Sequence, residues 1–432
     1  MIAPWIGILL GLVCCGLCLV IGNRLAKSPG ISEELARKFV HVAMGITCLS
    51  FPWVFASVWP VFVLCGLSLI GLIVVKLHPK LRGRAGGCLY GVERQSLGEL
   101  YFAVGIAVLF WWSDGDPLMF CVPTLVLTVA DAAGALIGLR YGKTSYATLT
   151  GHKSAEGSAM FFLAAFMSAH VPLLLFSEIG RAEVLLVSLT LALLVMLVEA
   201  ISTGGLDNLL IPLGGHFLLS EYMTMPIATL GGRFILVVLL VTVVLTLRKR
   251  SSLNGGALLG AALFGYGSFA LGGWSCFIIP LIIFLSHLHA TRRVATKVDE
   301  THTLSAVLSL SATGLVWLVF GEPPIKAFAL GLVVHFAILS YNTIAFLDLS
   351  TSTISNLWRS TAKAVLFCYL PLVLLMPEMW VLALCAIPIT LVGTACFSYF
   401  YPARPKVSDS AGRWVTQFII ATTASCFALL IP

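Results

Sequence analysis

The stretch from Val129 to Ser158 places a carboxylate where an apolar run would otherwise continue, in VADAAGALIGLRYGKTSYATLTGHKSAEGS. Asp131 lies inside that run. A carboxylate within hydrocarbon costs about 2.5–3.5 kcal/mol on insertion scales and is a functional candidate by default. Gly134, Gly138 and Gly142 recur every four residues after it, which indicates close packing of one helix face against a neighbour.

A polar loop ends the same stretch, immediately before the next apolar run. It reads GHKSAEGS and contains Lys153, Ser154, Glu156 and Gly157, with Lys143 a few residues upstream. Free backbone N–H groups at a helix start, together with a lysine, favour a phosphate group. The spacing does not match the Walker A loop. The loop therefore predicts a phosphate site of another type.

A third polar group interrupts the apolar sequence in EAISTGGLDNLLIPLGG, residues 199–215. Glu199 closes one apolar run, and Asp207 and Asn208 open the next. A broken helix exposes backbone groups that a membrane tolerates only around a protein-lined or watery cavity. Aspartate and asparagine oxygens suit a hard cation such as Mg²⁺. The alternative is a plain helix N-cap, which explains Asp207 or Asn208 but leaves Glu199 unexplained.

Two further clusters contain basic residues close to apolar runs. In SEELARKFVHVAMG, Arg37 and His41 share a helix face, as do Lys38 and His41, and the alternative is a cationic membrane flank with one interfacial histidine. The loop 77–100 brings Arg94 and Glu99 to the start of a span. The structural alternative is that most charged residues of this loop are simply solvated. On that alternative Glu99 lies at a helix N-terminus, where the helix dipole favours a carboxylate.

The composition indicates what positions these residues. The 432-residue chain is 59% hydrophobic and 10% charged, whereas soluble proteins carry about 25% charged residues. Long continuous apolar runs exclude the alternation of a β-barrel. We expect an all-α, polytopic integral membrane protein of about 15–16 transmembrane helices. The predicted spans lie near 2–22, 39–56, 58–76, 100–113, 117–138, 159–176, 182–198, 207–221, 231–247, 254–271, 274–290, 303–320, 327–347, 362–376, 379–398 and 414–431.

Loop charge and cysteine usage narrow the class of protein further. Lysines and arginines concentrate in alternate loops, as expected for the cytoplasmic connections of a membrane protein. The net charge of +7 therefore does not indicate a nucleic-acid partner. The twelve cysteines fall mostly in apolar runs and predict no metal site and no disulfide framework. All the polar groups above lie on the predicted cytoplasmic side. The stretch RKRSSLN, 248–254, divides the chain into a charge-bearing half and a charge-poor half, which predicts domains 1–250 and 251–432.

Taken in order, five stretches resemble the polyprenol kinase family of phytol, farnesol and dolichol kinases, which is related to CTP-dependent phosphatidate cytidylyltransferases. They are ARKFVH (36–41), RQSLGELYF (94–102), ADAAGALIGLRYGK (130–143), KSAEGS (153–158) and EAISTGGLDNLLIPL (199–213). The resemblance covers roughly residues 30–245 and implies transfer of the γ-phosphoryl group of CTP, or another nucleotide, to an isoprenoid alcohol drawn from the membrane lipid, with Mg²⁺.

The same resemblance implies roles for the candidate residues. Asp131 and Asp207 would serve as metal ligands or bases, with Asn208 beside them at the metal, and Lys153 would contact the phosphates. The nucleotide would lie among a larger set, namely Arg37, Lys38, His41, Lys143, Ser154, Glu156 and Gly157. Arg94, Glu99 and Glu199 are further candidates. The implied membrane is a bacterial inner membrane, with a plastid or endoplasmic reticulum membrane as alternatives.

The second half resembles, more faintly, the membrane family that includes phytyl-phosphate kinases, through residues 255–287 and the basic loop that follows. The polar runs typical of that family are reduced here to 301–314 and 341–356, where Asp348 alone remains of an acidic pair. We expect a degenerate partner domain. Two alternatives stay open for the whole chain: a cytidylyltransferase that makes a CDP-lipid, and a transporter that uses the intramembrane charges as a path.

Overall fold

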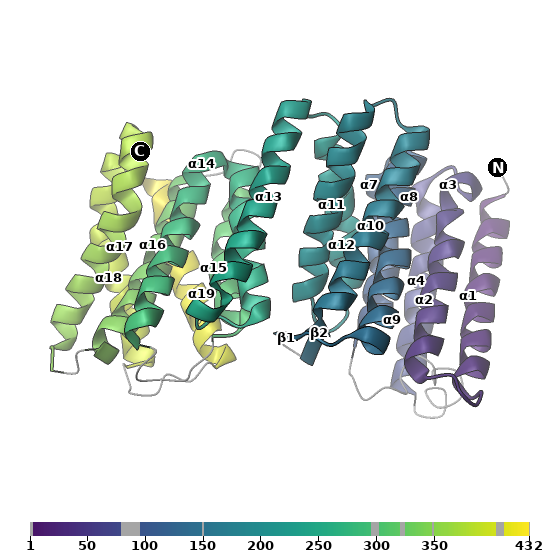
Figure 1. Ribbon diagram of the computed structural model, residues 1–432, viewed down its shortest axis with the longest axis horizontal. Helices are drawn as coiled ribbons and strands as arrows, with labels where there is room; N and C mark the ends of the chain where they lie inside the picture. Colours follow the sequence, from purple (N-terminus) through teal and green to yellow (C-terminus); the bar gives the residue numbers. More distant parts are fainter. Residues whose placement is uncertain are drawn as a thin grey trace. The chain divides into compact units, whose positions relative to one another are not determined.

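The computed structural model describes residues 3–78, 96–148, 151–294, 302–319, 325–347, 350–402 and 410–431. Helices make up nearly all of this part (Figure 1). They are α1 Pro4–Ala26, α2 Glu33–Leu49, α3 Phe51–Val54, α4 Val58–Leu77, α7 Gly98–Trp112, α8 Pro117–Leu125, η1 Val126–Ala130, α9 Asp131–Tyr141, α10 Ala155–Phe176, α11 Arg181–Ile201, α12 Asp207–Tyr222, α13 Ile227–Leu247, η2 Arg248–Arg250, α14 Gly255–Val294, α15 Leu304–Leu318, α16 Ile325–Leu347, α17 Thr353–Leu375, η3 Pro377–Met379, α18 Trp380–Phe400, α19 Ala411–Cys426 and η4 Phe427–Leu430. The predicted all-α fold class is confirmed.

The apolar runs seen in the sequence all fall on helices. Eleven helical segments of the described chain are long and apolar enough to cross a membrane, and α7 and α15 are shorter apolar helices. Large apolar side chains such as Trp5, Leu9 and Leu17 of α1 lie exposed on the surface, as lipid-facing residues do. The chain is a multi-pass membrane protein.

One local feature agrees with the sequence prediction and another differs from it. The predicted spans 254–271 and 274–290 lie on either side of a break within α14, at Gly273, where φ is 65° and ψ is −161°. Only glycine adopts this backbone conformation without strain. The polar loop after α9 forms a two-stranded hairpin, β1 Ser145–Thr148 and β2 Gly151–Ser154, whose second strand leads directly into α10. The sequence between α9 and α10 is too short and too polar to continue either helix. Its backbone N–H and C=O groups are instead satisfied by pairing between the two short strands.

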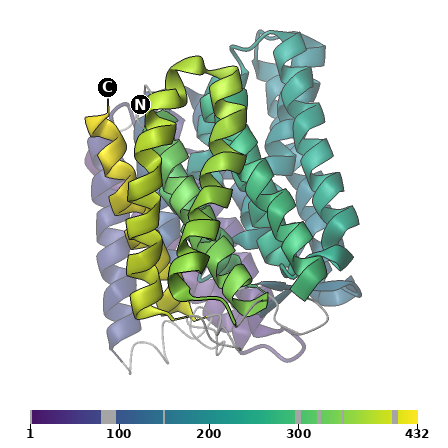
Figure 2. The same cartoon turned by 90° about the vertical axis from the view of Figure 1, so that its left-hand side faces the viewer.

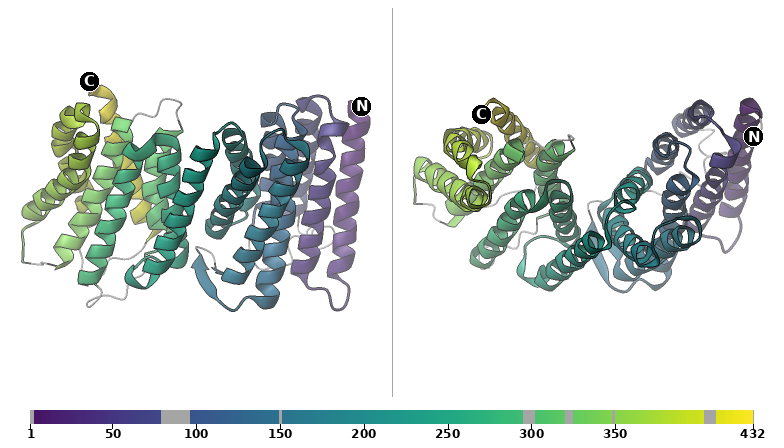
Figure 3. Two further views of the ribbon diagram at one scale, coloured as in Figure 1. Left: turned by 45° about the horizontal axis from the view of Figure 1, so that its top comes forward. Right: turned by 90° about the horizontal axis from the view of Figure 1, so that it is seen from above.

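The described chain divides into two compact units. The N-terminal unit comprises residues 1–146 and 150–235, and the C-terminal unit comprises residues 147–149 and 236–432, so the division falls within α13. Within each unit the helices run along a common direction and are seen nearly end-on from above (Figure 3).

Antiparallel connections in the N-terminal unit bring the polar ends of its helices together. The start of α2, the end of α9, the hairpin and the start of α12 all lie at the lower end of this unit in Figure 1. A separate apolar cluster, which includes Phe51, Phe110 and Phe120, packs α3, α7 and α8 together with stacked and edge-to-face rings. This core holds the helices that carry the polar residues.

The C-terminal unit is organised around α16, which is buried along most of its length. Its consecutive residues Ala327–Ile338 are buried on every side, because α14, α15, α17, α18 and α19 all pack around it. Figure 2 shows α17, α18 and α19 side by side in front of this central helix. A helix that is apolar all round belongs in such an interior position.

Candidate active site

The deepest charges of the N-terminal unit form a cluster between α2 and α9. The Nζ of Lys38 donates a hydrogen bond to Oδ2 of Asp131 at 2.6 Å, and Nε2 of His41 lies 3.3 Å from the same oxygen. The side chains of Lys38 and Asp131 are only 5% and 11% exposed. The buried negative charge of Asp131 is therefore neutralised by Lys38 of the protein itself. Lys38 and His41 both contact Oδ2, and neither of them contacts Oδ1.

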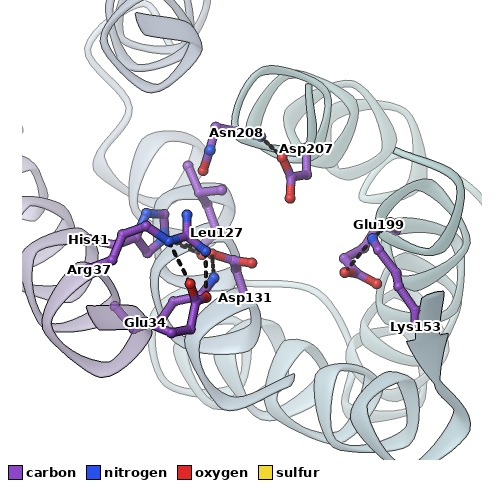
Figure 4. Close-up of polar contacts among 10 residues, drawn as sticks. Glu34, Arg37, His41, Leu127, Asp131, Lys153, Glu199, Asp207 and Asn208 are labelled. Atoms are coloured by element: carbon purple, nitrogen blue, oxygen red, sulfur yellow. Dashed lines mark hydrogen bonds and ion pairs between the residues drawn. The ribbon is translucent and has the colours of Figure 1, made fainter. Parts of the chain in front are cut away.

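Local helix geometry explains how these side chains meet. Ser32 caps α2 by accepting a hydrogen bond from the backbone N–H of Leu35, which fixes the start of the helix. Lys38 and His41 are three residues apart and therefore project from the same side of α2. Both contact Asp131 in the sequence-distant helix α9, and Figure 4 shows His41 beside this carboxylate.

A π-helical turn, η1, immediately precedes Asp131. Single π-helical turns occur frequently at functional sites because they rotate the residues that follow. Nε2 of His41 lies 3.1 Å from the carbonyl oxygen of Leu127 within this turn, so the histidine contacts both the turn and the carboxylate. This turn was not predicted, although Pro123, which cannot donate a helical hydrogen bond, was an available signal.

A second ion pair lies one turn earlier on α2. Nη2 and Nε of Arg37 donate to the two oxygens of Glu34 at 2.5 and 2.9 Å. The Arg37 side chain is 36% exposed, more than that of Lys38. Glu34 was absent from the predicted site, and its spacing of three residues from Arg37 was the signal for this pair.

The third pair joins the hairpin to the end of α11. Nζ of Lys153 donates to Oε1 of Glu199 at 2.7 Å and also to the backbone carbonyl oxygen of Glu199. The two side chains are 21% and 16% exposed. Lys153 belongs to strand β2. Its partner lies 46 residues further along the chain, so residue spacing could not predict this ion pair.

Tyr146 supports this region and was not among the predicted residues. Its hydroxyl lies 2.8 Å from the hydroxyl oxygen of Ser158, which ties β1 to the first turn of α10. Burial, with a smaller contribution from the negative charge of Glu199, raises the pKa of Tyr146 to about 12. The phenol thus stays neutral at physiological pH and acts as a hydrogen-bonding group.

The start of α10 is capped by its own residues. Oγ of Ser154 accepts a hydrogen bond from the backbone N–H of Gly157 at 3.1 Å, and the exposed Glu156 accepts one from the backbone N–H of Thr144. A Cβ on Gly157 would lie 2.9 Å from the carbonyl oxygen of Gly134, so α9 and α10 pack in close contact through small residues. The packing interpretation of the glycines is confirmed, and Lys143 lies exposed nearby.

Asp207 and Asn208 occupy the first turn of α12. The N-cap residue is Leu206, which makes no side-chain capping hydrogen bond, so the simple N-cap alternative does not account for Asp207 or Asn208. Gly205 has φ of 90°, and a Cβ there would lie 2.4 Å from the backbone of Gly98. The glycine therefore permits α7 and α12 to approach each other.

Asn208 presents a buried oxygen toward the centre of the site. It is 9% exposed, and its Oδ1 has no hydrogen-bond partner in the described part of the chain. A buried polar atom of this kind needs an ion, a water molecule or a ligand group. The backbone N–H of Asn208 donates a hydrogen bond to Oδ1 of Asp207 at 3.1 Å.

The carboxylates of Asp131, Asp207 and Glu199 point toward one another across the space enclosed by α2, α9, α11 and α12 (Figure 4). No group of three or more histidine, cysteine, aspartate or glutamate side chains forms a ready-made metal cage among the described residues. Mg²⁺ is usually held by one or two carboxylates together with substrate phosphates. The oxygen donors of Asp207 and Asn208 fit that kind of shared site.

Two remaining candidates have different positions. Glu99, in the first turn of α7, lies 3.2 Å from Nζ of Lys76, which also donates to the carbonyl oxygen of Ser96. This pair ties α4 to α7 and supports the structural explanation of Glu99. Arg94 lies outside the described residues.

Two known proteins are similar in sequence to this chain. The phytol kinase of Synechocystis sp. is 32% identical over 194 residues, which are 44% of this chain and 79% of that protein. A probable chloroplastic phytol kinase 2 of Glycine max is 28% identical over 168 residues, which are 38% of this chain and 54% of that protein. No model of a known protein family matches, and no solved structure matches.

Proposed function

Because the chain belongs to the phytol kinase family, we propose that it transfers the terminal phosphoryl group of CTP, with Mg²⁺, to an isoprenoid alcohol such as phytol, geranylgeraniol or farnesol. The observation that carries the proposal is the convergence of Asp131, Glu199 and Asp207, with the cations Lys38 and Lys153, at one end of the N-terminal unit. Phosphoryl transfer depends mainly on positioning and on neutralising charge.

The phosphates would bind between the cations. Lys153 now contacts a carboxylate, and a nucleotide phosphate offers it the same type of charge-assisted hydrogen bond. Arg37 is more exposed than the buried pair and would contact the nucleotide from α2. In this arrangement Glu199 holds Lys153 in place until the nucleotide arrives.

Asp207 and Asn208 would hold Mg²⁺ through their side-chain oxygens. When bound, Mg²⁺ neutralises the charge on the phosphates and fixes their geometry. The buried, unpartnered Oδ1 of Asn208 supports this assignment, since an oxygen acceptor in that position suits a cation. The neighbouring carboxylate of Asp207 points into the same space.

Asp131 would orient the alcohol. Lys38 and His41 both contact Oδ2, and they fix the carboxylate so that Oδ1 can accept the hydroxyl proton of the alcohol. The oxygen of the alcohol then forms a bond to the γ-phosphorus, and the bond to the β-phosphate oxygen breaks, which releases CDP. The alcohol enters from the bilayer, and the nucleotide approaches from the predicted cytoplasmic face of a bacterial or plastid membrane.

Labelled nucleotides test this proposal. Purified protein in maltoside micelles is incubated with γ-labelled CTP or ATP, Mg²⁺ and a panel of prenols of increasing chain length. We expect label in the prenyl phosphate and release of CDP, with CTP preferred over ATP. Release of pyrophosphate with incorporation of CMP into lipid would instead indicate a cytidylyltransferase. The same protein reconstituted into sealed vesicles tests the transporter alternative, which prenol flux without nucleotide would indicate.

A further inference from the structure

The C-terminal unit contains a cavity of about 680 Å³ that the kinase site does not use. Helices α13, α14, α15, α16, α17 and α19 contribute to its lining, and all the residues that line it belong to this unit. Its volume falls in the range of sites that hold one small molecule, roughly 300–1,000 Å³. The chain therefore has room for a ligand outside its N-terminal unit.

Apolar side chains of three helices form much of this lining. Helices α13, α14 and α16 are each long and apolar enough to cross a membrane, so the cavity belongs to the membrane-spanning part of the chain. Their apolar contributions include Leu240, Val243, Val244, Ala261, Phe264, Ile283, Phe284, Phe336 and Leu339. Such a lining favours a ligand with a long hydrocarbon chain, because burial of apolar surface is favourable.

Hydroxyl and imidazole side chains also line the cavity. Nε2 of His287 lies 3.3–3.4 Å from the hydroxyl oxygens of Ser251, Ser252 and Thr291, and all four residues belong to the lining. Groups of these types can donate and accept hydrogen bonds. The lining therefore suits a ligand that carries a polar group as well as an apolar chain.

Ser340, on the central helix α16, has an unsatisfied hydroxyl in this lining. It is 2% exposed, and its Oγ has no hydrogen-bond partner within the described chain. Polar side chains in a helix can bond to the carbonyl oxygen four residues earlier, as Asn342 and Thr343 do on the same helix. Ser340 makes no such bond. A buried hydroxyl of this kind needs a partner, which a ligand in the cavity can supply.

Four cationic side chains complete the lining, namely Lys249, Arg250, Lys363 and Arg413. The first two are exposed. The other two have partners in the protein, which include the rings of Phe336 and Trp414, whose centres lie 5.2 and 4.8 Å from the respective cations. These cations therefore give no reason to expect an anionic headgroup, whereas the unsatisfied hydroxyl matches a neutral one.

We propose that this cavity binds a long-chain alcohol, whose chain lies among the apolar residues and whose hydroxyl forms a hydrogen bond with Ser340. A hydroxyl headgroup can both accept and donate, as Ser340 can. A hydrocarbon without a headgroup would leave Ser340 unsatisfied, and a charged headgroup would lose its hydration in a largely apolar lining. The site lies wholly within the C-terminal unit, and it stands whether or not the N-terminal unit transfers a phosphoryl group.

Photolabelling of the full-length protein in maltoside micelles tests this site. The probe is hexadecanol with a diazirine in its chain, and the labelled residues are identified by mass spectrometry of the digested protein. We expect label on cavity-lining residues of α13 and α14, because the chain lies against them. Label that avoids the cavity, on the N-terminal unit alone or on exposed apolar residues alone, would overturn the proposal.

Unlabelled competitors of equal chain length identify the headgroup. They are hexadecanol, hexadecane, hexadecyl phosphate and hexadecyltrimethylammonium. We expect hexadecanol to suppress labelling of the cavity at least about fivefold better than the other three, because hexadecane loses the hydrogen bond to a buried hydroxyl and the ions must be desolvated. Equal competition by hexadecane, or stronger competition by either ion, would refute the assignment. Phytol, added in a parallel series, distinguishes a branched isoprenoid chain from a straight one, and the alcohol that competes better identifies the source of the ligand.

Ser340→Ala removes the hydroxyl that the proposal uses. It should weaken competition by hexadecanol about fivefold and leave that by hexadecane unchanged. The thermal unfolding temperature should not fall, because the hydroxyl has no partner within the described chain. Ser268→Ala is the matched control: Ser268 is also buried in a helix of this unit, but its hydroxyl bonds to the carbonyl oxygen of Phe264 and it does not line the cavity. Equal effects of the two changes on labelling would refute the role of Ser340.

Gly265→Leu fills part of the cavity from α14. An added Cβ at this position meets Leu240, which also lines the cavity, at 3.9 Å, so the larger side chain extends beside the apolar lining. We expect reduced labelling by the probe in a variant whose thermal unfolding remains cooperative. Unchanged labelling in both Gly265→Leu and Ser340→Ala would place the bound alcohol outside this cavity.

Discussion

In the N-terminal unit the buried cations lie against carboxylates, Lys38 on Asp131 and Lys153 on Glu199. In the C-terminal unit Lys363 and Arg413 lie against aromatic rings, and the described part of that unit contains Glu378 as its single carboxylate. One unit therefore balances its buried charge internally. In the other unit, the contacts of Lys363 and Arg413 include the faces of the rings of Phe336 and Trp414.

This difference has consequences for chemistry and for stability. A buried ion pair is costly to break, because removing one partner leaves an uncompensated charge in a medium of low dielectric. A Mg²⁺–nucleotide carries both an anion and a cation, so it can exchange partners with such ion pairs. Its phosphates would contact the lysines, and its Mg²⁺ would contact the carboxylates. The comparison thus separates buried charges held in ion pairs, which a substrate can re-pair, from cations that also lie against aromatic rings.

Breaking the Lys38–Asp131 pair should have the largest effect. Lys38→Met or Asp131→Asn should lower prenol kinase activity by about 10³-fold, since a positioned acid or base contributes about 10²–10⁴-fold. Each single change should also reduce the free energy of unfolding by about 3–5 kcal/mol, because the other charge stays buried. Labelled-phosphoryl transfer and thermal unfolding measure the two effects.

The double variant Lys38→Met/Asp131→Asn separates these effects. Removing both charges should restore much of the lost stability while activity stays low. Glu34→Gln, in the more exposed pair on the same helix, serves as the control and should change stability by less than about 1 kcal/mol. An active double variant would exclude Asp131 from the chemistry.

The Lys153–Glu199 pair should give the next largest effect. Lys153→Met should lower kcat/KM for CTP by about 10²-fold, as the loss of one charge-stabilising donor commonly does. Lys143→Gln, an exposed lysine from the same region between α9 and α10, should stay within a few-fold of the wild type. Steady-state kinetics against CTP concentration measure both variants. If Lys143→Gln proved the more damaging change, the phosphates would lie outside the space between Lys153 and Glu199.

Periodicity and composition were sufficient to predict the helices, because each span must be about 20 apolar residues long whatever it packs against. They also placed the boundary between the spans 254–271 and 274–290 at the break within α14, at Gly273. They could not predict the hairpin, whose pairing involves few residues. Asp131 was identifiable since its charge is unusual at that depth. Its partner was not, because Lys38 lies 93 residues away and looked like part of a cationic flank.

The structure also changed the interpretation of residues that the sequence had grouped together. Residue types indicated that Lys153 and Ser154 belonged to one phosphate loop, whereas the folded chain pairs Lys153 with Glu199 and uses Ser154 to cap α10. Glu199 had been a secondary candidate and is a direct partner of the lysine. Such pairings depend on tertiary packing, which residue spacing alone does not specify.

Asn208→Ala should alter the dependence on Mg²⁺ more than the maximum rate. Loss of the side-chain oxygen should raise the Mg²⁺ concentration for half-maximal activity about tenfold, by analogy with the loss of a group that supports a metal site. Asn208→Asp keeps an oxygen in that position and should retain most of the affinity. Asn342→Ala, an amide of the C-terminal unit, is the matched control. Identical Mg²⁺ curves for Asn208→Ala and wild type would remove Asn208 from the metal site.

Lys363→Gln should have the smallest effect on stability and tests the comparison from its other side. The side chain contacts the ring of Phe336, and a cation–π contact is worth about 0.5–2 kcal/mol. The change in the free energy of unfolding should therefore stay below about 2 kcal/mol, less than the loss of about 3–5 kcal/mol expected for Lys38→Met. Thermal unfolding beside Lys38→Met measures the contrast directly, because both changes remove one lysine charge. A loss as large as that of Lys38→Met would mean that Lys363 neutralises a negative group, and the two units would then treat charge alike.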